Sequence, residues 1–164
     1  MKAWLGLGSN LQNPVTQLKD ALGRLGVAEG IKILKTSSLY RTPPWGDELQ
    51  NDFINAVVQI ESNLKPLSLL HVLQSIENAM GRQRGGRRWG PRLIDIDLLL
   101  CDEQWCQSEE LEIPHPRMHE RAFVLKPLCE LDAAVEIPGH GTAGDLLQQL
   151  DCSGIFCLNN EERD

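Results

Sequence analysis

The sequence lacks a long hydrophobic run. No apolar stretch approaches the roughly 20 residues that a transmembrane helix needs, so we expect no association with a membrane. The N-terminal segment, MKAWLGLGSN, contains one lysine and no sustained apolar region, which differs from a signal peptide. We therefore expect a cytoplasmic protein.

Paired cysteine motifs are also missing. The five cysteines are odd in number and form no C-x-x-C pair, whereas disulfide frameworks and zinc sites use even or closely spaced sets. His115 and His119 have H-x-x-x-H spacing, but Pro116 disfavours a helix covering both, and no third ligand is evident. We expect reduced thiols, as in a cytoplasm, and no zinc.

The chain has no internal repeat, no low-complexity tract and no linker. Its 164 residues, of which 41% are hydrophobic and 24% charged, suit a soluble globular domain with a real core. We therefore expect one domain over residues 1–164.

Basic charge is scarce except in one segment. Residues 82–92, RQRGGRRWGPR, hold five arginines and no acid, and the rest of the chain has 11 basic against 23 acidic residues, a net charge of −12. A solvated loop and a nucleic-acid module are alternative interpretations, but the latter would be basic over a wide face. The pattern favours a local site for a small polyanion such as a nucleoside triphosphate, because arginine binds phosphate oxygens well.

Hydrophobic periodicity predicts strands mixed with helices. The two prolines in segment 40–47 exclude regular structure there, and Pro127 should break or kink the third helix. Because the elements do not alternate strictly, we expect an α+β fold with a mostly antiparallel sheet and helices on its faces. The expected strands are 2–8, 31–40, 53–61 and 93–101 with an extended piece at 111–113, and the expected helices are 15–25, 66–80, 117–131 and 141–150.

Two aspartates stand in the middle of the strand expected from Leu93 onward. Asp95 and Asp97 are two residues apart and should point to one face, and burial of an isolated carboxylate is costly. Mg²⁺ would relieve both charges, because it takes carboxylate oxygens together with substrate phosphates. Pairing with the nearby arginines, or a solvated edge strand, would account for them as well.

Further side chains are placed where they could surround a ligand. Phe53 and Asn55 share a strand face and could hold a flat heterocycle by stacking and hydrogen bonding, although ordinary packing is the commoner explanation of such a pair. Gln74 and Glu77 lie at the margin of an apolar helix stripe and could reach the sheet. Two tryptophans in expected loops could close over a ligand or simply pack down, namely Trp45 and Trp89.

Several motifs run through nearly the whole chain, in the order GLGSNL, SSLYRTPPWG, DFINAVV, LLHVLQSIENAMGRQR, RWGPRLIDIDLLL and IPHPRMHERAFVLKPLCEL. Together they resemble the 6-hydroxymethyl-7,8-dihydropterin pyrophosphokinase family of folate biosynthesis. The resemblance implies a ferredoxin-like three-layer α/β/α sandwich and a monomer. It also implies transfer of pyrophosphate from ATP to the pterin hydroxymethyl group, giving AMP and the pterin diphosphate.

The resemblance also implies residue roles. Two Mg²⁺ ions would lie on Asp95 and Asp97, and Arg82 and Arg92 would assist the transfer. Glu110 and Glu112 stand where the family leads us to expect an arginine and a threonine. Another two-metal phosphotransferase would share the aspartates but need no pterin pocket. The implied ATP contacts are Gln74, Glu77, Arg84, Trp89, Arg92, Leu98, His115 and Arg121, and the implied pterin contacts are Thr42, Pro43, Trp45, Phe53, Asn55 and Phe123, with the two phenylalanines on opposite faces of the ring.

Overall fold

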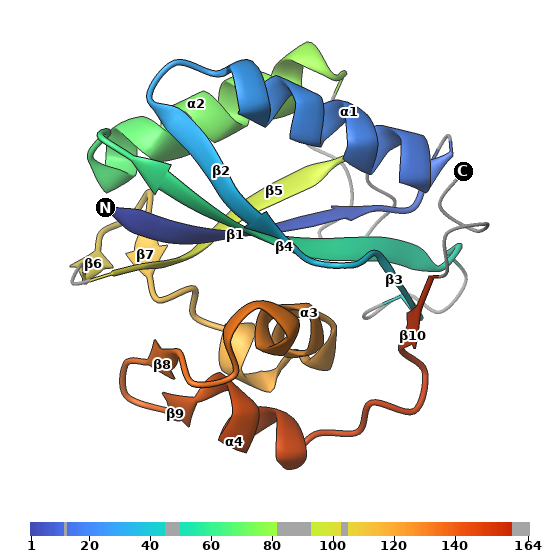
Figure 1. Cartoon of the computed structure of the whole chain (residues 1–164). Coiled ribbons are helices and arrows are strands. Elements are labelled where there is room, and N and C mark those ends of the chain that lie inside the picture. Colours follow the sequence, from blue (N-terminus) through green and yellow to red (C-terminus); the bar gives the residue numbers. More distant parts are fainter. Residues whose placement is uncertain (12, 45–49, 82–92, 103–104, 159–164) are drawn as a thin grey trace.

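The chain forms a sheet that lies between two layers of helices (Figure 1). The computed structural model describes residues 1–11, 13–44, 50–81, 93–102 and 105–158. In chain order the elements are β1 (Lys2–Ser9), α1 (Pro14–Val27), β2 (Ile31–Thr36), β3 (Tyr40–Thr42), β4 (Phe53–Ser62), α2 (Pro66–Ala79), β5 (Asp95–Cys101), β6 (Cys106–Gln107), β7 (Glu112–Ile113), the 3₁₀ helix η1 (Met118–Glu120), α3 (Ala122–Asp132), β8 (Glu136–Ile137), β9 (Gly141–Thr142), α4 (Ala143–Gln148) and β10 (Phe156–Cys157).

The main sheet is built around β4 and β1. Its strand order is β10-β3-β4-β1-β5, and β2 also pairs with β4. The strand pairs described in this sheet are antiparallel, which confirms the expected α+β class and the mostly antiparallel sheet. Strand β5 lies at one edge of this order, next to β1.

Alternation along the strands gives the sheet two apolar faces. Leu5 and Leu7 on β1 belong to a core packed under α1 and α2, whereas Trp4 belongs to a second core with side chains of α3 and α4. The helices bury matching stripes, for example Leu18 and Leu25 of α1, because residues three to four positions apart share a helix face. Both faces of the sheet are therefore covered, and polar residues on its strands need a specific reason to be there.

The structure corrects three local expectations. Tyr40–Thr42 forms β3 inside the segment expected to be irregular, because residues before a proline favour extended backbone. Pro127 lies within an unbroken α3, where the buried Val124 and Leu128 on either side pack into the second core and offset the lost hydrogen bond. Strand β5 begins at Asp95, so the aspartates open the strand rather than occupy its middle.

None of the helices in the described ranges is long and apolar enough to cross a membrane. The longest helices, α1 and α2, have 14 residues each, and both use their apolar stripes to cover the sheet.

Replacement of Leu18 by alanine tests the contribution of the α1 stripe. Leu18 is fully buried, so we expect Leu18→Ala to lower the free energy of unfolding by about 2–5 kcal/mol. Val27 at the end of the same helix is 85% exposed, and Val27→Ala should change that quantity by no more than about 0.5 kcal/mol. Urea titration followed by circular dichroism measures both, and equal losses would contradict the packing described here.

Candidate active site

Strand register places a polar row on the sheet face that α3 covers. Asp95 on β5 lies opposite Gly8 on β1, and Gly8 lies opposite Asn55 on β4. Directly opposed residues point to the same face of a sheet. The carboxylate of Asp95 and the amide of Asn55 are thus separated by one strand whose residue at that point has no side chain.

A buried hydrogen bond defines one end of this row. The Asn55 Nδ2 atom donates to Thr42 Oγ1 at 2.7 Å, and both residues are buried. Phe53 shares their face and is half-buried, so an aromatic ring and an oriented amide stand together, as the sequence predicted. A β-carbon at Gly8 would lie 2.7 Å from Asn55 Oδ1, which means that only glycine leaves this amide in place.

The two aspartates occupy the other end of the row. Asp95 and Asp97 lie opposite Gly8 and Gly6 of β1, so they share one face as expected. Asp95 is half-buried and Asp97 is exposed, so both carboxylates retain contact with solvent. The cost of removing them from water is therefore lower than for the buried strand that the sequence predicted.

These carboxylates fit a hard divalent cation. Among the described residues no group of three or more His, Cys, Asp and Glu side chains gathers, so the protein offers this cation a pair of carboxylates. Mg²⁺ commonly binds through one or two carboxylates and completes its shell with water and substrate phosphates. Asp95 and Asp97 could hold Mg²⁺ in this way, with the shell left open toward a polyphosphate.

A cation approaches the aspartates from the start of α3. Burial lowers the pKa of the Arg121 guanidinium below its usual range, and the negative charge of Asp97 is the largest influence in the opposite direction. The Arg121 Cζ atom lies 5.6 Å from the ring centroid of Phe123. Arg121 therefore connects the carboxylate end of the row to the aromatic side chain that α3 contributes.

His115 is held as a neutral imidazole. Burial lowers its pKa to about 4, and the positive charge of Arg121 acts in the same direction. The backbone amide of Arg117 donates to His115 Nδ1 at 3.2 Å, so the ring proton belongs on Nε2. The backbone amide of His115 also donates to Leu99 O of β5 at 2.8 Å, which fixes the residue at the sheet edge as a neutral donor.

Helix α2 contributes two polar residues beside β5. Gln74 is half-buried, whereas Glu77 is only 4% exposed and its Oε2 accepts a hydrogen bond from the Ile96 amide at 3.0 Å. The sequence placed Glu77 at the margin of the helix stripe, and its full burial was not predicted. Leu98 is also buried, at 3% exposed.

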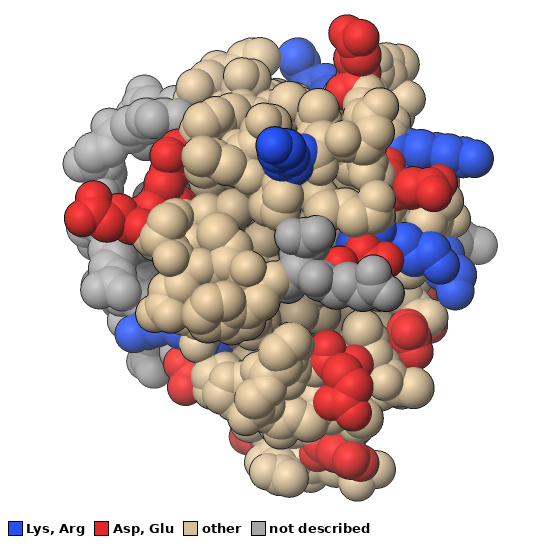
Figure 2. Space-filling view, turned by 90° about the vertical axis from the view of Figure 1, so that its left-hand side faces the viewer, with Lys and Arg blue, Asp and Glu red and all other residues tan. Residues whose placement is uncertain are grey.

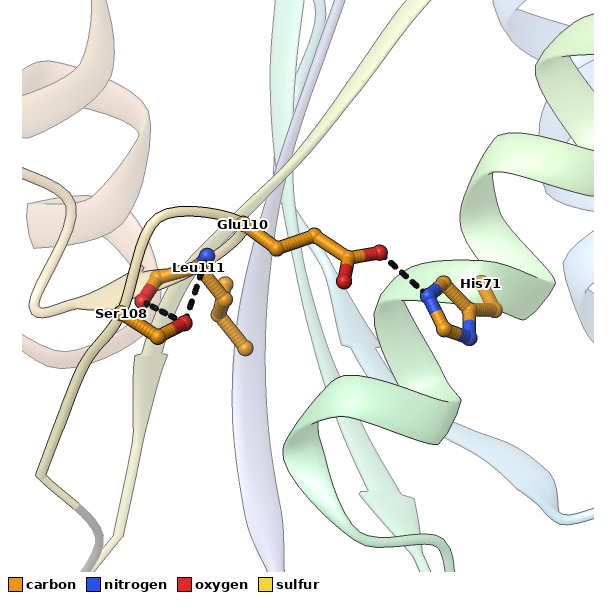
Figure 3. Close-up of polar contacts among 4 residues, drawn as sticks. All are labelled: His71, Ser108, Glu110 and Leu111. Carbon is orange, nitrogen blue, oxygen red and sulfur yellow. Dashed lines mark hydrogen bonds and ion pairs between the residues drawn. The ribbon is translucent and has the colours of Figure 1, made fainter.

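A surface ion pair joins α2 to the turn between β6 and β7 (Figure 3). His71 Nε2 and Glu110 Oε1 are 2.5 Å apart, with both side chains about half exposed. The turn itself is closed by Ser108 Oγ, which interacts with the backbone of Leu111. Glu110, which differs from the family expectation, is therefore engaged by a histidine of this chain.

The described residues bring together much of the set that the sequence singled out. Gly8 was missed as a site residue, although two glycines spaced by two on a strand were a signal for an open sheet face. Pro43 is exposed, and Gly154 approaches it closely enough that a β-carbon there would lie 3.1 Å from its Cγ. Five predicted residues lie outside the described ranges, namely Trp45, Arg82, Arg84, Trp89 and Arg92.

The class of protein follows from the carboxylate pair and its surroundings. Two carboxylates that leave a metal shell open to phosphate, next to donors for phosphate oxygens, are typical of metal-dependent phosphotransferases. The family described as 7,8-dihydro-6-hydroxymethylpterin-pyrophosphokinase (HPPK) matches residues 4–133. The chain belongs to this family, whose members are ATP-dependent pyrophosphokinases, and the resemblance seen in the motifs is confirmed.

Individual proteins of this family are similar to the chain over nearly its whole length. The chain is 47% identical over 154 residues to the 2-amino-4-hydroxy-6-hydroxymethyldihydropteridine pyrophosphokinase of Methylorubrum extorquens, covering 94% of this chain and 96% of that one. It is 44% identical over 157 residues to the protein of the same name from Haemophilus influenzae, covering 96% and 98%.

A solved structure supports the fold. The Plasmodium falciparum protein HPPK-DHPS superposes with a TM-score of 0.70 at 17% identity, over 90% of this chain and 45% of that chain. At this identity the likeness concerns the fold alone, and it confirms the ferredoxin-like α+β fold. The present chain spans less than half of that longer protein.

Alanine at Gly8 should displace the Asn55 amide from its bond to Thr42. The new β-carbon would lie 2.7 Å from Asn55 Oδ1, and loss of the buried bond to Thr42 costs about 1–3 kcal/mol. We expect the KM for the pterin to rise about tenfold or more while the KM for ATP changes little. Gly23→Ala in α1 is the matched control, because its β-carbon meets nothing within 4 Å. An unchanged pterin KM in Gly8→Ala would contradict a role of the Asn55 amide in pterin binding.

The depressed pKa of His115 predicts a pH dependence of stability. Between pH 6.5 and about 4 the imidazole is protonated in the unfolded chain but neutral in the folded one, so the folded state loses stability as the pH falls through this window. The loss amounts to about 3 kcal/mol at most. The difference in unfolding free energy between the parent and His115→Gln should therefore rise with pH across the window and level off above it; parallel curves would contradict the assignment.

Proposed function

We propose that this chain transfers pyrophosphate from ATP to the hydroxymethyl group of 6-hydroxymethyl-7,8-dihydropterin, giving AMP and the pterin diphosphate for folate biosynthesis. The observation that carries the proposal is the register that sets Asp95 across one glycine from Asn55. Asn55 and Asp95 are separated by two strand spacings, about 10 Å, so a flat ring held at Asn55 could lie over Gly8 and extend a short substituent toward the carboxylates.

The pterin is held by an amide edge and by aromatic faces. The bond between Asn55 and Thr42 fixes the amide with its oxygen beside Gly8, where it is proposed to accept a hydrogen bond from the ring. Phe53 and Phe123 are proposed to stack on opposite faces of the pterin ring. Arg121 lies against Phe123, and its positive charge is proposed to stand between the pterin and the phosphates. Pro43 and Trp45 complete the proposed pterin contacts.

Asp95 and Asp97 are proposed to hold two Mg²⁺ ions. Ions bound there lower the proton affinity of the substrate hydroxyl and neutralise phosphate charge. The exposure of Asp97 leaves its oxygens accessible, and Gly6 and Gly8 opposite the aspartates leave the sheet face clear for the phosphates. Asp97 also stabilises the Arg121 cation, which keeps the guanidinium beside the same oxygens.

The remaining polar groups are proposed to receive ATP. Neutral His115 offers Nε2–H to a phosphate oxygen without adding charge, while Arg121 supplies a cation that is already partly desolvated. Arg82 and Arg92 are proposed to neutralise the charge that develops as AMP leaves. The other proposed ATP contacts are Gln74, Glu77, Arg84, Trp89 and Leu98.

The protein is proposed to act as a cytoplasmic monomer without a nucleic-acid or membrane partner. The net charge of the chain is −7, and Figure 2 shows acidic side chains over the layer of α3 and α4, with both signs intermingled above it. An acidic surface of this kind disfavours nonspecific binding to phosphate backbones.

The reaction is tested by its nucleotide product. The protein is incubated with Mg·ATP, with and without the hydroxymethyl-dihydropterin, and the nucleotides are resolved by chromatography. Attack at the β-phosphorus gives AMP that forms only when the pterin is present. Formation of ADP, or no pterin-dependent product from folded protein, would reject the proposed reaction.

Replacement of Asp97 by alanine tests the metal site. Because several kcal/mol of charge stabilisation is lost, we expect turnover to fall about a thousandfold or more, while the exposed position leaves the unfolding temperature nearly unchanged. Asp102→Ala at the opposite end of β5 is the control; this residue accepts a hydrogen bond from the Lys2 amide and should leave turnover intact. A fully active Asp95→Ala, Asp97→Ala double variant would exclude the proposed ligands.

A further inference from the structure

The outer edge of β5 is covered at the point where the metal-binding aspartates lie. Strand β5 pairs with β1 on one side, and on its other side the Ile96 amide donates to Glu77 Oε2 at 3.0 Å. Ile96 is the residue between Asp95 and Asp97. The hydrogen bond therefore ties helix α2 to the backbone segment that carries both carboxylates.

The geometry of an antiparallel edge explains why this contact matters. Backbone groups of alternate residues point to opposite sides of a strand. Since Ile96 turns its amide outward to Glu77, Asp95 and Asp97 turn their backbone groups inward to β1. The segment is thus held from both sides, by β1 at the two aspartates and by Glu77 between them.

The burial of Glu77 makes hydrogen-bond donors to its carboxylate necessary. Glu77 is 4% exposed, and a carboxylate removed from water must be compensated by donors. A charge-assisted bond to a backbone amide is roughly twice as strong as a neutral one. The Ile96 amide is one such donor, and it lies on the edge strand between the two aspartates.

We propose that Glu77 is a positioning residue that fixes the backbone between Asp95 and Asp97 and thereby sets the spacing of the two carboxylates for a divalent cation. This proposal rests on the proposed metal site. Outer-shell groups that orient ligands typically contribute about 10–100-fold to metal affinity. This contribution of Glu77 depends on the reach of its acceptor oxygen to the Ile96 amide.

Two conservative variants separate reach from charge. Glu77→Gln keeps the length and an acceptor oxygen but loses the charge, whereas Glu77→Asp keeps the charge but withdraws the oxygen by one methylene. Each is examined by hydrogen exchange at the Ile96 amide and by Mn²⁺ binding, titrated by electron paramagnetic resonance without nucleotide. Asn78→Ala, at the exposed next position of α2, is the matched control.

The proposal predicts a definite ranking. Asn78→Ala should protect the Ile96 amide and bind Mn²⁺ within about threefold of the parent, whereas Glu77→Asp should lose protection and bind Mn²⁺ about tenfold or more weakly. Glu77→Gln keeps an acceptor within reach, so it should retain more protection and a higher Mn²⁺ affinity than Glu77→Asp. At saturating Mg²⁺, Glu77→Asp should recover most of its kcat. The opposite ranking, or parent-like Mn²⁺ binding in Glu77→Asp with a raised KM for ATP, overturns the positioning role.

One further variant separates failure of this proposal from failure of the metal site itself. Asp97→Ala should lose Mn²⁺ binding in the same titration. If Asp97→Ala binds Mn²⁺ like the parent, the proposed ligands are wrong. If it loses binding while Glu77→Asp does not, the ligands stand and the positioning role of Glu77 is rejected.

Discussion

The pairing of β1 with a neighbour on each side is the constraint on which the rest of the site depends. Opposite Gly8 lie Asn55 on β4 and Asp95 on β5, so the amide proposed to hold the pterin and the carboxylate pair come from segments 40 residues apart. Gly8 has no side chain, and a β-carbon there would collide with Asn55. The distance between the proposed pterin-binding amide and the proposed metal ligands is thus set by two strand spacings, about 10 Å, across β1.

Electrostatics then arranges the groups around this frame. Arg121 is desolvated, which lowers its pKa, yet Asp97 favours its charged form. The same arginine helps to keep His115 neutral, so one cation and one uncharged donor stand near the carboxylates. The site proposed for a polyphosphate and divalent ions has to balance charges of both signs, and a second cation in place of the neutral histidine would compete with the metal for the same oxygens.

Local periodicity predicted a large part of this arrangement, and long-range pairing accounts for what it missed. A period of two placed Asp95 and Asp97 on one face and Phe53 with Asn55 on another strand, and both placements hold in the structure. The juxtaposition of these two pairs depends on the register of distant strands, which no local pattern contains. The expectation that Pro127 would break the third helix was also wrong, because α3 is held by tertiary packing that helix propensity does not include.

Helix α2 packs on one face of the sheet, yet it also contacts the backbone of β5 between the two aspartates, whose side chains lie on the other face. Its apolar stripe packs with Leu69 and Leu73 into the core, while Glu77 reaches the exposed edge of β5 and His71 meets Glu110 of the β6–β7 turn. An edge strand needs its outward backbone groups satisfied, and a buried carboxylate needs a donor. The contact between Glu77 and Ile96 serves both requirements, and because Ile96 lies between the aspartates, the packing of α2 acts directly on the backbone that carries the proposed metal ligands.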